Sequence, residues 1–82
     1  MSKPFTDFEQ VRMKVEAAQK MVGTATISMD PELLQHAAAT VQQARSQLEQ
    51  MKSVATDLDE VFLQNEENKL MQCEHQLQEA QQ

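Results

Sequence analysis

The sequence belongs to a short, acidic chain of 82 residues, which can form one domain at most, with a small core. Its 13 acidic and 7 basic residues give a net charge of -6, and residues 57–82 hold seven of the acids and one base. Binding to nucleic acid or to an anionic membrane surface is excluded as a leading function, because both need a basic surface.

The composition favours helices over strands. The chain has one Gly, two Pro and no Trp or Tyr, and it is rich in Ala, Leu, Gln, Glu and Met, which have high helix propensity. No apolar run approaches the roughly 18 residues of a membrane-spanning helix, and the first residues show no signal region. The single cysteine cannot form an internal disulfide, so we expect a cytoplasmic protein.

A first helix is predicted over residues 6–22. Thr6 and Glu9 fit a capping box, in which each side chain bonds the backbone N–H of the other residue. Gly23 is expected to end the helix, because glycine readily adopts the left-handed conformation that follows a helix. The apolar positions repeat at spacings of three and four, which is a heptad seam: Phe8, Val11, Val15, Ala18 and Val22.

A second helix is predicted over residues 31–54. Asp30 suits the N-cap, and Pro31 suits the first helical position, where its fixed φ is already helical. The apolar seam continues for six turns with the same spacing: Leu34, Ala37, Val41, Ala44, Leu48, Met51 and Ala55.

A third helix is predicted over residues 58–80, after a cap at Thr56 or Asp57. Glu66 interrupts its apolar seam, so a break there or a turn of this segment toward solvent are open alternatives. We predict one continuous helix, because no Gly or Pro marks a stop. The seam consists of Leu63, Leu70, Cys73, Leu77 and Ala80.

Short connections make consecutive helices antiparallel neighbours, so residues 1–82 are predicted to form one all-α domain, an up-down-up three-helix bundle. Counting outward from the turns brings the phenylalanines to one end of the bundle, as a cluster of Phe5, Phe8, Met51 and Phe62. Apolar residues off the seams, Met13 and Met71 among them, leave a homodimer as an alternative.

The segment LMQCEHQLQ holds the only cysteine and one of two histidines. At 100° per residue, Cys73 lies on the apolar seam and His75 on the opposite side of the helix. His36 is expected at the level of His75 but facing another way. We therefore predict no metal site and no cofactor, because a zinc site needs about four convergent ligands. A metal-binding or cysteine-dependent activity at these three residues is the least favoured alternative.

The leading functional hypothesis is a non-enzymatic helical protein that acts by protein–protein interaction through an exposed helix face. The residues proposed for that surface are Met13, Met71, Glu67, Glu74 and His75. The main alternative is an acidic inhibitor or mimic that binds a basic protein surface through residues 57–82. Salt would weaken the second kind of contact steeply and the first kind little.

Five segments, TDFEQV, AAQKMVG, SMDPE, ARSQLEQ and CEHQL, resemble a small uncharacterised family of helical proteins from endospore-forming Gram-positive bacteria. The resemblance extends over nearly the whole chain. It implies a bacterial source, and it implies no functional residues, because the family carries no assigned activity.

Overall fold

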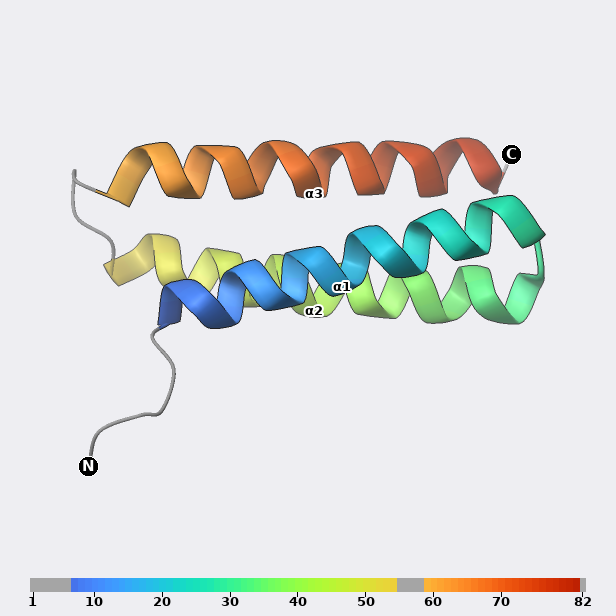
Figure 1. Ribbon diagram of the computed structural model, residues 1–82, viewed down its shortest axis with the longest axis horizontal. Helices are drawn as coiled ribbons and strands as arrows, with labels where there is room; N and C mark the ends of the chain where they lie inside the picture. Colours follow the sequence, from blue (N-terminus) through green and yellow to red (C-terminus); the bar gives the residue numbers. More distant parts are fainter. Residues whose placement is uncertain (1–6, 55–58, 82) are drawn as a thin grey trace, which may run out of the picture.

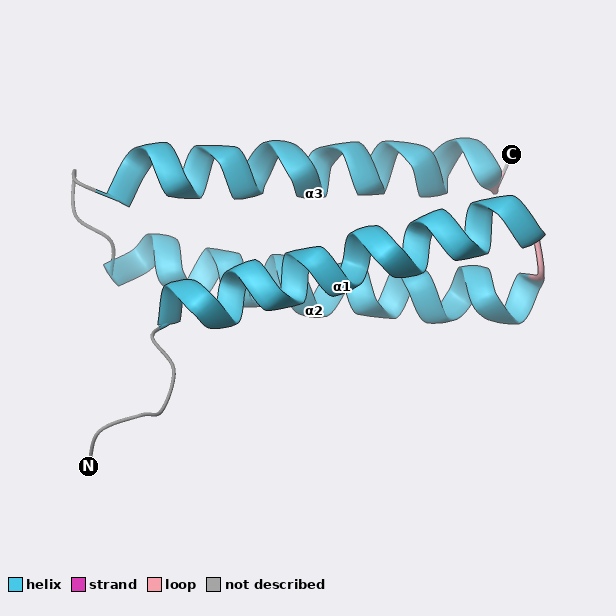
Figure 2. Cartoon of the chain, viewed as in Figure 1, coloured by secondary structure: helices cyan, strands magenta, loops and turns pink. Residues whose placement is uncertain are grey.

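The computed structural model describes residues 7–54 and 59–81. Three helices account for almost all of them: α1 (Asp7–Ser28), α2 (Pro31–Val54) and α3 (Glu60–Ala80). They run up, down and up along one long axis, with each helix packed against the other two (Figures 1 and 2). The predicted all-α three-helix bundle is confirmed. Phe5, Thr6, the last predicted seam residue Ala55 and the predicted caps at Thr56 or Asp57 lie outside the described residues.

The core consists of the heptad seams of the three helices. Leu48 of α2 and Leu70 of α3 are completely buried, and Phe8, Phe62 and Ala80 pack against the core from its edges. The predicted seams are therefore the buried faces. The buried apolar residues are Val11, Val15, Ala18, Val22, Ala25, Leu34, Ala37, Val41, Ala44, Leu48, Met51, Leu63, Leu70, Cys73 and Leu77.

The first helix extends six residues beyond its predicted end, so the prediction that Gly23 ends it is wrong. Gly23 does not have a positive φ, and the helix continues through it to Ser28. Ala25 is fully buried and continues the seam, and Thr26 Oγ1 donates to the carbonyl oxygen of Val22 at 2.8 Å. This packing outweighs the cost of a helical glycine, which is about 1 kcal/mol.

A turn of two residues joins α1 to α2. Met29 has φ 59° and donates its N–H to the carbonyl oxygen of Ala25 at 2.8 Å, which closes α1. Asp30 Oδ1 accepts the N–H of Glu32 at 2.9 Å, and Pro31 is the first residue of α2. This confirms the predicted start of α2. It also explains the end of α1, because a proline disfavours the helical conformation in the residue before it.

Gly23→Ala should stabilise the protein by about 0.5 to 1 kcal/mol, because alanine loses less backbone entropy in a helix. A Cβ at Gly23 would have no atom within 4 Å and would meet no obstacle. Thermal unfolding should show a midpoint several degrees higher, since about 1 kcal/mol moves the midpoint of a domain this size by roughly 4–8 °C. Met29→Ala is the matched control and should gain nothing, because alanine is equally strained at a positive φ. A destabilised Gly23→Ala variant would contradict the helical conformation of this residue.

The aromatic end of the bundle forms as predicted for the residues described. Phe8 and Phe62 meet edge to face, with ring centroids 5.1 Å apart and an interplanar angle of 78°. Such pairs add about 0.5–1.5 kcal/mol to the effect of burial. The contact places the first turns of α1 and α3 at one level, with the buried Met51 of α2 at the same end.

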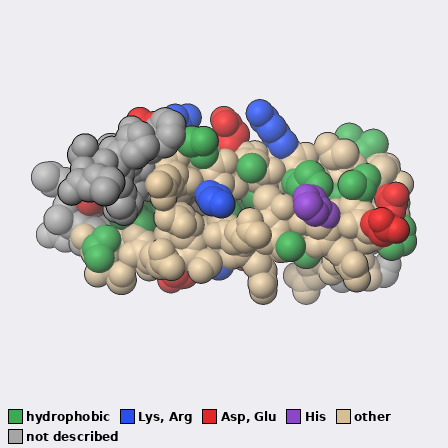
Figure 3. Space-filling model, turned by 90° about the horizontal axis from the view of Figure 1, so that it is seen from below, with side chains coloured by type: hydrophobic (Ala, Val, Ile, Leu, Met, Phe, Trp, Pro, Cys, Tyr) green, Lys and Arg blue, Asp and Glu red, His purple; other side chains and the backbone are tan. Residues whose placement is uncertain are grey.

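The backbone and the side chains that are neither hydrophobic, charged nor histidine, drawn in tan, cover most of the face seen in Figure 3. Hydrophobic side chains appear on it as separate small patches between these groups, and charged side chains are few. Isolated exposed apolar residues are normal for soluble proteins. On this face, candidate sites are therefore individual side chains and small groups of side chains.

Candidate functional site

The three residues of the cysteine–histidine hypothesis do not form a common site. Cys73 is 2% exposed and belongs to the core, whereas His75 is 68% exposed on α3 and lies 3.4 Å from Glu79. His36 is exposed on α2. Within residues 7–54 and 59–81, no group of three or more His, Cys, Asp or Glu residues could hold a metal ion.

The thiol of Cys73 is poorly suited to nucleophilic chemistry. Burial, together with the negative charge of Glu74, raises the pKa of Cys73 above its ordinary value. The reactive form of a cysteine is the thiolate, and reactive cysteines lie in electropositive, partly exposed surroundings. Cys73 has neither property and acts as a small core residue.

An ion-pair cluster, here called the Arg45 clamp, joins α2 to α3. It consists of Arg45 and Lys52 of α2 and Glu67 and Glu74 of α3. Arg45 grips Glu74 with two hydrogen bonds, Nη2 to Oε1 at 2.9 Å and Nε to Oε2 at 3.2 Å. Its Nη1 bonds both oxygens of Glu67 at 2.7 Å, and Lys52 Nζ bonds Glu67 Oε1 at 2.6 Å. One guanidinium therefore fixes two turns of α3 against α2.

The clamp shifts the proton affinities of its members. Hydrogen bonds from Arg45, and next from Lys52, hold the pKa of Glu67 below its ordinary value. The hydrogen bonds of Arg45, first to Glu74, raise the pKa of its guanidinium further. The bond to Glu67 likewise raises the pKa of Lys52. Glu67 and Glu74 are part of the surface proposed from the sequence for a partner. In the structure both form ion pairs with basic side chains of the same chain.

The lowered pKa of Glu67 predicts a loss of stability in acid. Stability from this ionised group is complete above its unfolded pKa of about 4.5 and is lost as pH falls through the lower folded pKa. Glu67→Gln should cost about 1 kcal/mol at pH 7 and should flatten the acid limb of the stability curve. Urea unfolding from pH 7 to pH 3 measures both effects. Glu79→Gln is the control, because an exposed ion pair contributes little; an equal flattening by both variants would contradict the role of the clamp.

Glu66 occupies a core position in α3. It is 3% exposed, and its Oε2 accepts a hydrogen bond from Lys69 Nζ at 3.0 Å. Its Oε1 has no hydrogen-bond partner among the described residues. Because α3 is continuous and Leu63 and Leu70 on either side are buried, the alternatives of a break or an outward turn at Glu66 are wrong.

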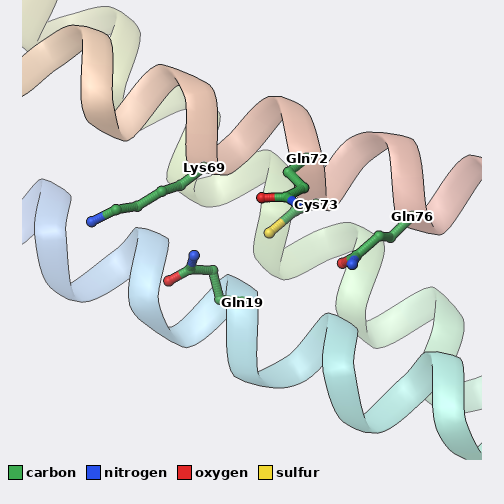
Figure 4. A pocket seen from close by; sticks show the side chains of 5 residues that line it. All are labelled: Gln19, Lys69, Gln72, Cys73 and Gln76. Atoms are coloured by element: carbon green, nitrogen blue, oxygen red, sulfur yellow. The ribbon is translucent and has the colours of Figure 1, made fainter.

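A polar groove lies between α1 and α3, with a volume of about 160 Å³. Figure 4 shows the amide of Gln19 on α1 facing α3, while the sulfur of Cys73 points into the groove from α3. Beside the groove the seam of α3 stays buried, at Leu70, Cys73 and Leu77. Its lining residues are Gln19, Lys69, Gln72, Cys73 and Gln76.

A second groove, of about 300 Å³, lies on α1 and is mostly apolar. Met13 is 51% exposed there, and the groove borders α2, because Gln47 Nε2 donates to Gln10 Oε1 at 3.4 Å. Met71 is 54% exposed on α3 and is not among the lining residues. The two methionines proposed from the sequence therefore do not share this groove. Its described lining residues are Gln10, Met13, Lys14 and Ala17.

Sequence reasoning missed the Arg45 clamp. A signal was present, because Glu67 and Glu74 are seven residues apart and therefore project from the same side of a helix. Pairing Arg45 with these two glutamates would also have required the rotation of α2 about its own axis. The heptad seam shows which face of α2 is buried, but it does not fix that rotation closely enough to place one side chain.

Comparison with known proteins identifies the family of the chain. Residues 4–82 match the model of a family described as "Protein of unknown function (DUF2564)". The chain is 36% identical over 75 residues to the "Uncharacterized protein YpzA" of Bacillus subtilis (strain 168), covering 92% of the chain and 83% of this relative. No solved structure matches the chain significantly. None of the described helices has the length and apolar character needed to cross a bilayer. The resemblance to an uncharacterised bacterial family is confirmed, and the chain belongs to the DUF2564 family.

Proposed function

We propose that the protein acts without catalysis, by binding another protein through the surface of α1 that contains Met13. The observation that carries the proposal is the apolar groove in which Met13 lies half exposed. Methionine is flexible and polarizable, so it can adapt to the shape of a partner. Lys14 lines the same groove and supplies a charged rim to an apolar centre, an arrangement typical of protein interfaces.

The acidic alternative is less well supported, because α3 uses several carboxylates internally. Glu66 binds Lys69, and Glu67 and Glu74 both bind Arg45. These three account for much of the charge that a basic partner would need. Binding that falls steeply between low and high salt would favour this alternative over the Met13 surface.

The cysteine-dependent alternative has the least support, because Cys73 is buried and the pKa of its thiol is raised. We place the protein in the cytoplasm on the basis of its single cysteine, since an extracellular domain of this size usually depends on disulfides.

Site-specific photo-crosslinking in the native cell tests the proposal. A photoreactive residue at position 13 should capture one partner protein in good yield. The same residue at position 71 tests the other methionine, and position 35, an exposed glutamine of α2, is the background control. Capture from position 71 alone would move the interface to α3, and equal capture from all three positions would contradict a specific surface.

A second copy of the chain is one candidate partner. Light scattering over a range of concentrations distinguishes it from a different protein. If the chain dimerises, Met13→Lys should return it to a monomer, while its thermal unfolding as a monomer should change little.

A further inference from the structure

We infer that the apolar face which α1 and α2 present to α3 is a second binding surface, which accepts an amphipathic helix of another protein, and that α3 is its built-in competitor. This goes beyond the proposed function, since it uses the opposite side of α1 from Met13. The α1–α2 hairpin, residues 7–54, is the binding unit, and α3 covers it when no partner is present.

Glu66 destabilises the docked state of α3. A carboxylate occupies a core position, with one oxygen bonded to Lys69 of its own helix and the other without a partner among the described residues. Neither oxygen is bonded to α1 or α2, so the group adds no specific contact to the hairpin in return. A buried polar atom without a partner lowers the stability of the state that buries it. Docking of α3 is weakened at this position.

The polar contacts of α3 differ between its α2 side and its α1 side. On the α2 side the Arg45 clamp holds it with close ion pairs. On the α1 side a polar groove lies beside the buried seam of α3, with Gln19 of α1 facing Lys69 and Gln72 of α3 (Figure 4). The cations of the clamp can form the same ion pairs with the carboxylates of another acidic helix. Apolar side chains in the place of the groove would add packing between α1 and α3.

The hairpin would present an apolar face if α3 left it. Its buried apolar seams, from Val11 to Ala25 on α1 and from Leu34 to Met51 on α2, would line an open face. Arg45 and Lys52 would lie at its border without their α3 carboxylates, and Glu49 of α2 would be the one carboxylate left beside them among the ion pairs described. An apolar face bordered by two cations fits an acidic amphipathic helix, which is the chemistry of α3 itself.

The partner is therefore a helix with an apolar heptad seam and with acidic residues that reach Arg45 and Lys52. It differs from α3 at the position of Glu66, where an apolar residue would bind better. Because α3 is tethered to the hairpin, it competes at an effective concentration on the order of 1 mM. A partner therefore displaces α3 only if it binds the hairpin more tightly than α3 does.

The experiment uses the full chain and a fluorescent synthetic peptide of residues 59–81 that carries Glu66→Leu. The peptide should bind the full chain about ten- to a hundredfold more tightly than the unaltered peptide, as expected from removing a buried unpaired polar group. At saturation, hydrogen exchange of the chain should quicken in α3 and stay slow in α1 and α2. No binding up to about 1 mM peptide, or binding without faster exchange in α3, would overturn the inference.

Two variants of the full chain identify the surface. Glu66→Leu in the chain itself improves the competitor, so it should weaken binding of the peptide about ten- to a hundredfold. Met13→Lys should leave it unchanged, which separates this surface from the one proposed above. Equal binding by the Glu66→Leu chain and the unaltered chain would show that the peptide binds elsewhere and would overturn the inference.

Discussion

Glu66→Leu should stabilise the folded protein by about 1 to 3 kcal/mol, although it changes a charged residue that has an ion-pair partner. The substitution removes an oxygen that is buried without a hydrogen bond among the described residues. It also completes the apolar seam between Leu63 and Leu70, and replacement of buried ionic groups by apolar residues is often stabilising. Thermal unfolding and urea unfolding should both show the gain.

Glu66→Gln is the matched control for this result. Glutamine keeps the size and polarity of the side chain but gives up the ion pair with Lys69, so it should not reproduce the gain. If Glu66→Leu instead destabilised the protein by more than about 1 kcal/mol, the carboxylate would have to make a stabilising contact beyond the one to Lys69.

Leu48→Ala should destabilise the protein by about 2 to 5 kcal/mol, the range for a buried leucine replaced by alanine. Leu48 is completely buried in the C-terminal half of α2, the longest of the described helices, and the surrounding helices can close the resulting cavity only in part. A domain has a total stability of about 5–15 kcal/mol, so this variant should lose a large fraction of its stability. Urea unfolding followed by circular dichroism measures the loss.

Val54→Ala, at the end of the same helix, is the control for Leu48→Ala. Val54 is 70% exposed, and a surface substitution should change stability by no more than about 0.5 kcal/mol. Similar losses in the two variants would contradict the arrangement of α2 in the bundle.

Much of the fold could be predicted because the heptad spacing and the helix caps agree. The bounds of α2 are as predicted, because Asp30 and Pro31 mark its start by chemistry that acts locally. The end of α1 was wrong for the opposite reason. Burial of Ala25 depends on the other helices, and it outweighs the local signal at Gly23. No residue-level rule would have chosen Met29 for the left-handed position.

The candidate surfaces were less predictable than the core. The solvent exposure of Met13, Met71 and His75 could be read from the helical period. The ion pairs of Glu67 and Glu74 could not be predicted in this way, because they depend on the long side chain of Arg45 on another helix. The burial of Glu66 could not be predicted from the apolar spacing either, because a glutamate at a seam position ordinarily indicates that the seam has ended.

The two-residue turn at Met29 and Asp30 has a consequence for the order of folding. Helices joined so closely have contacts between residues near in sequence, and such contacts form quickly because little chain entropy is lost. The pairing of α1 and α2 should therefore be established in the folding transition state, before α3 docks. Substitutions in α3 should then accelerate unfolding and leave the folding rate nearly unchanged, while substitutions such as Leu48→Ala slow folding.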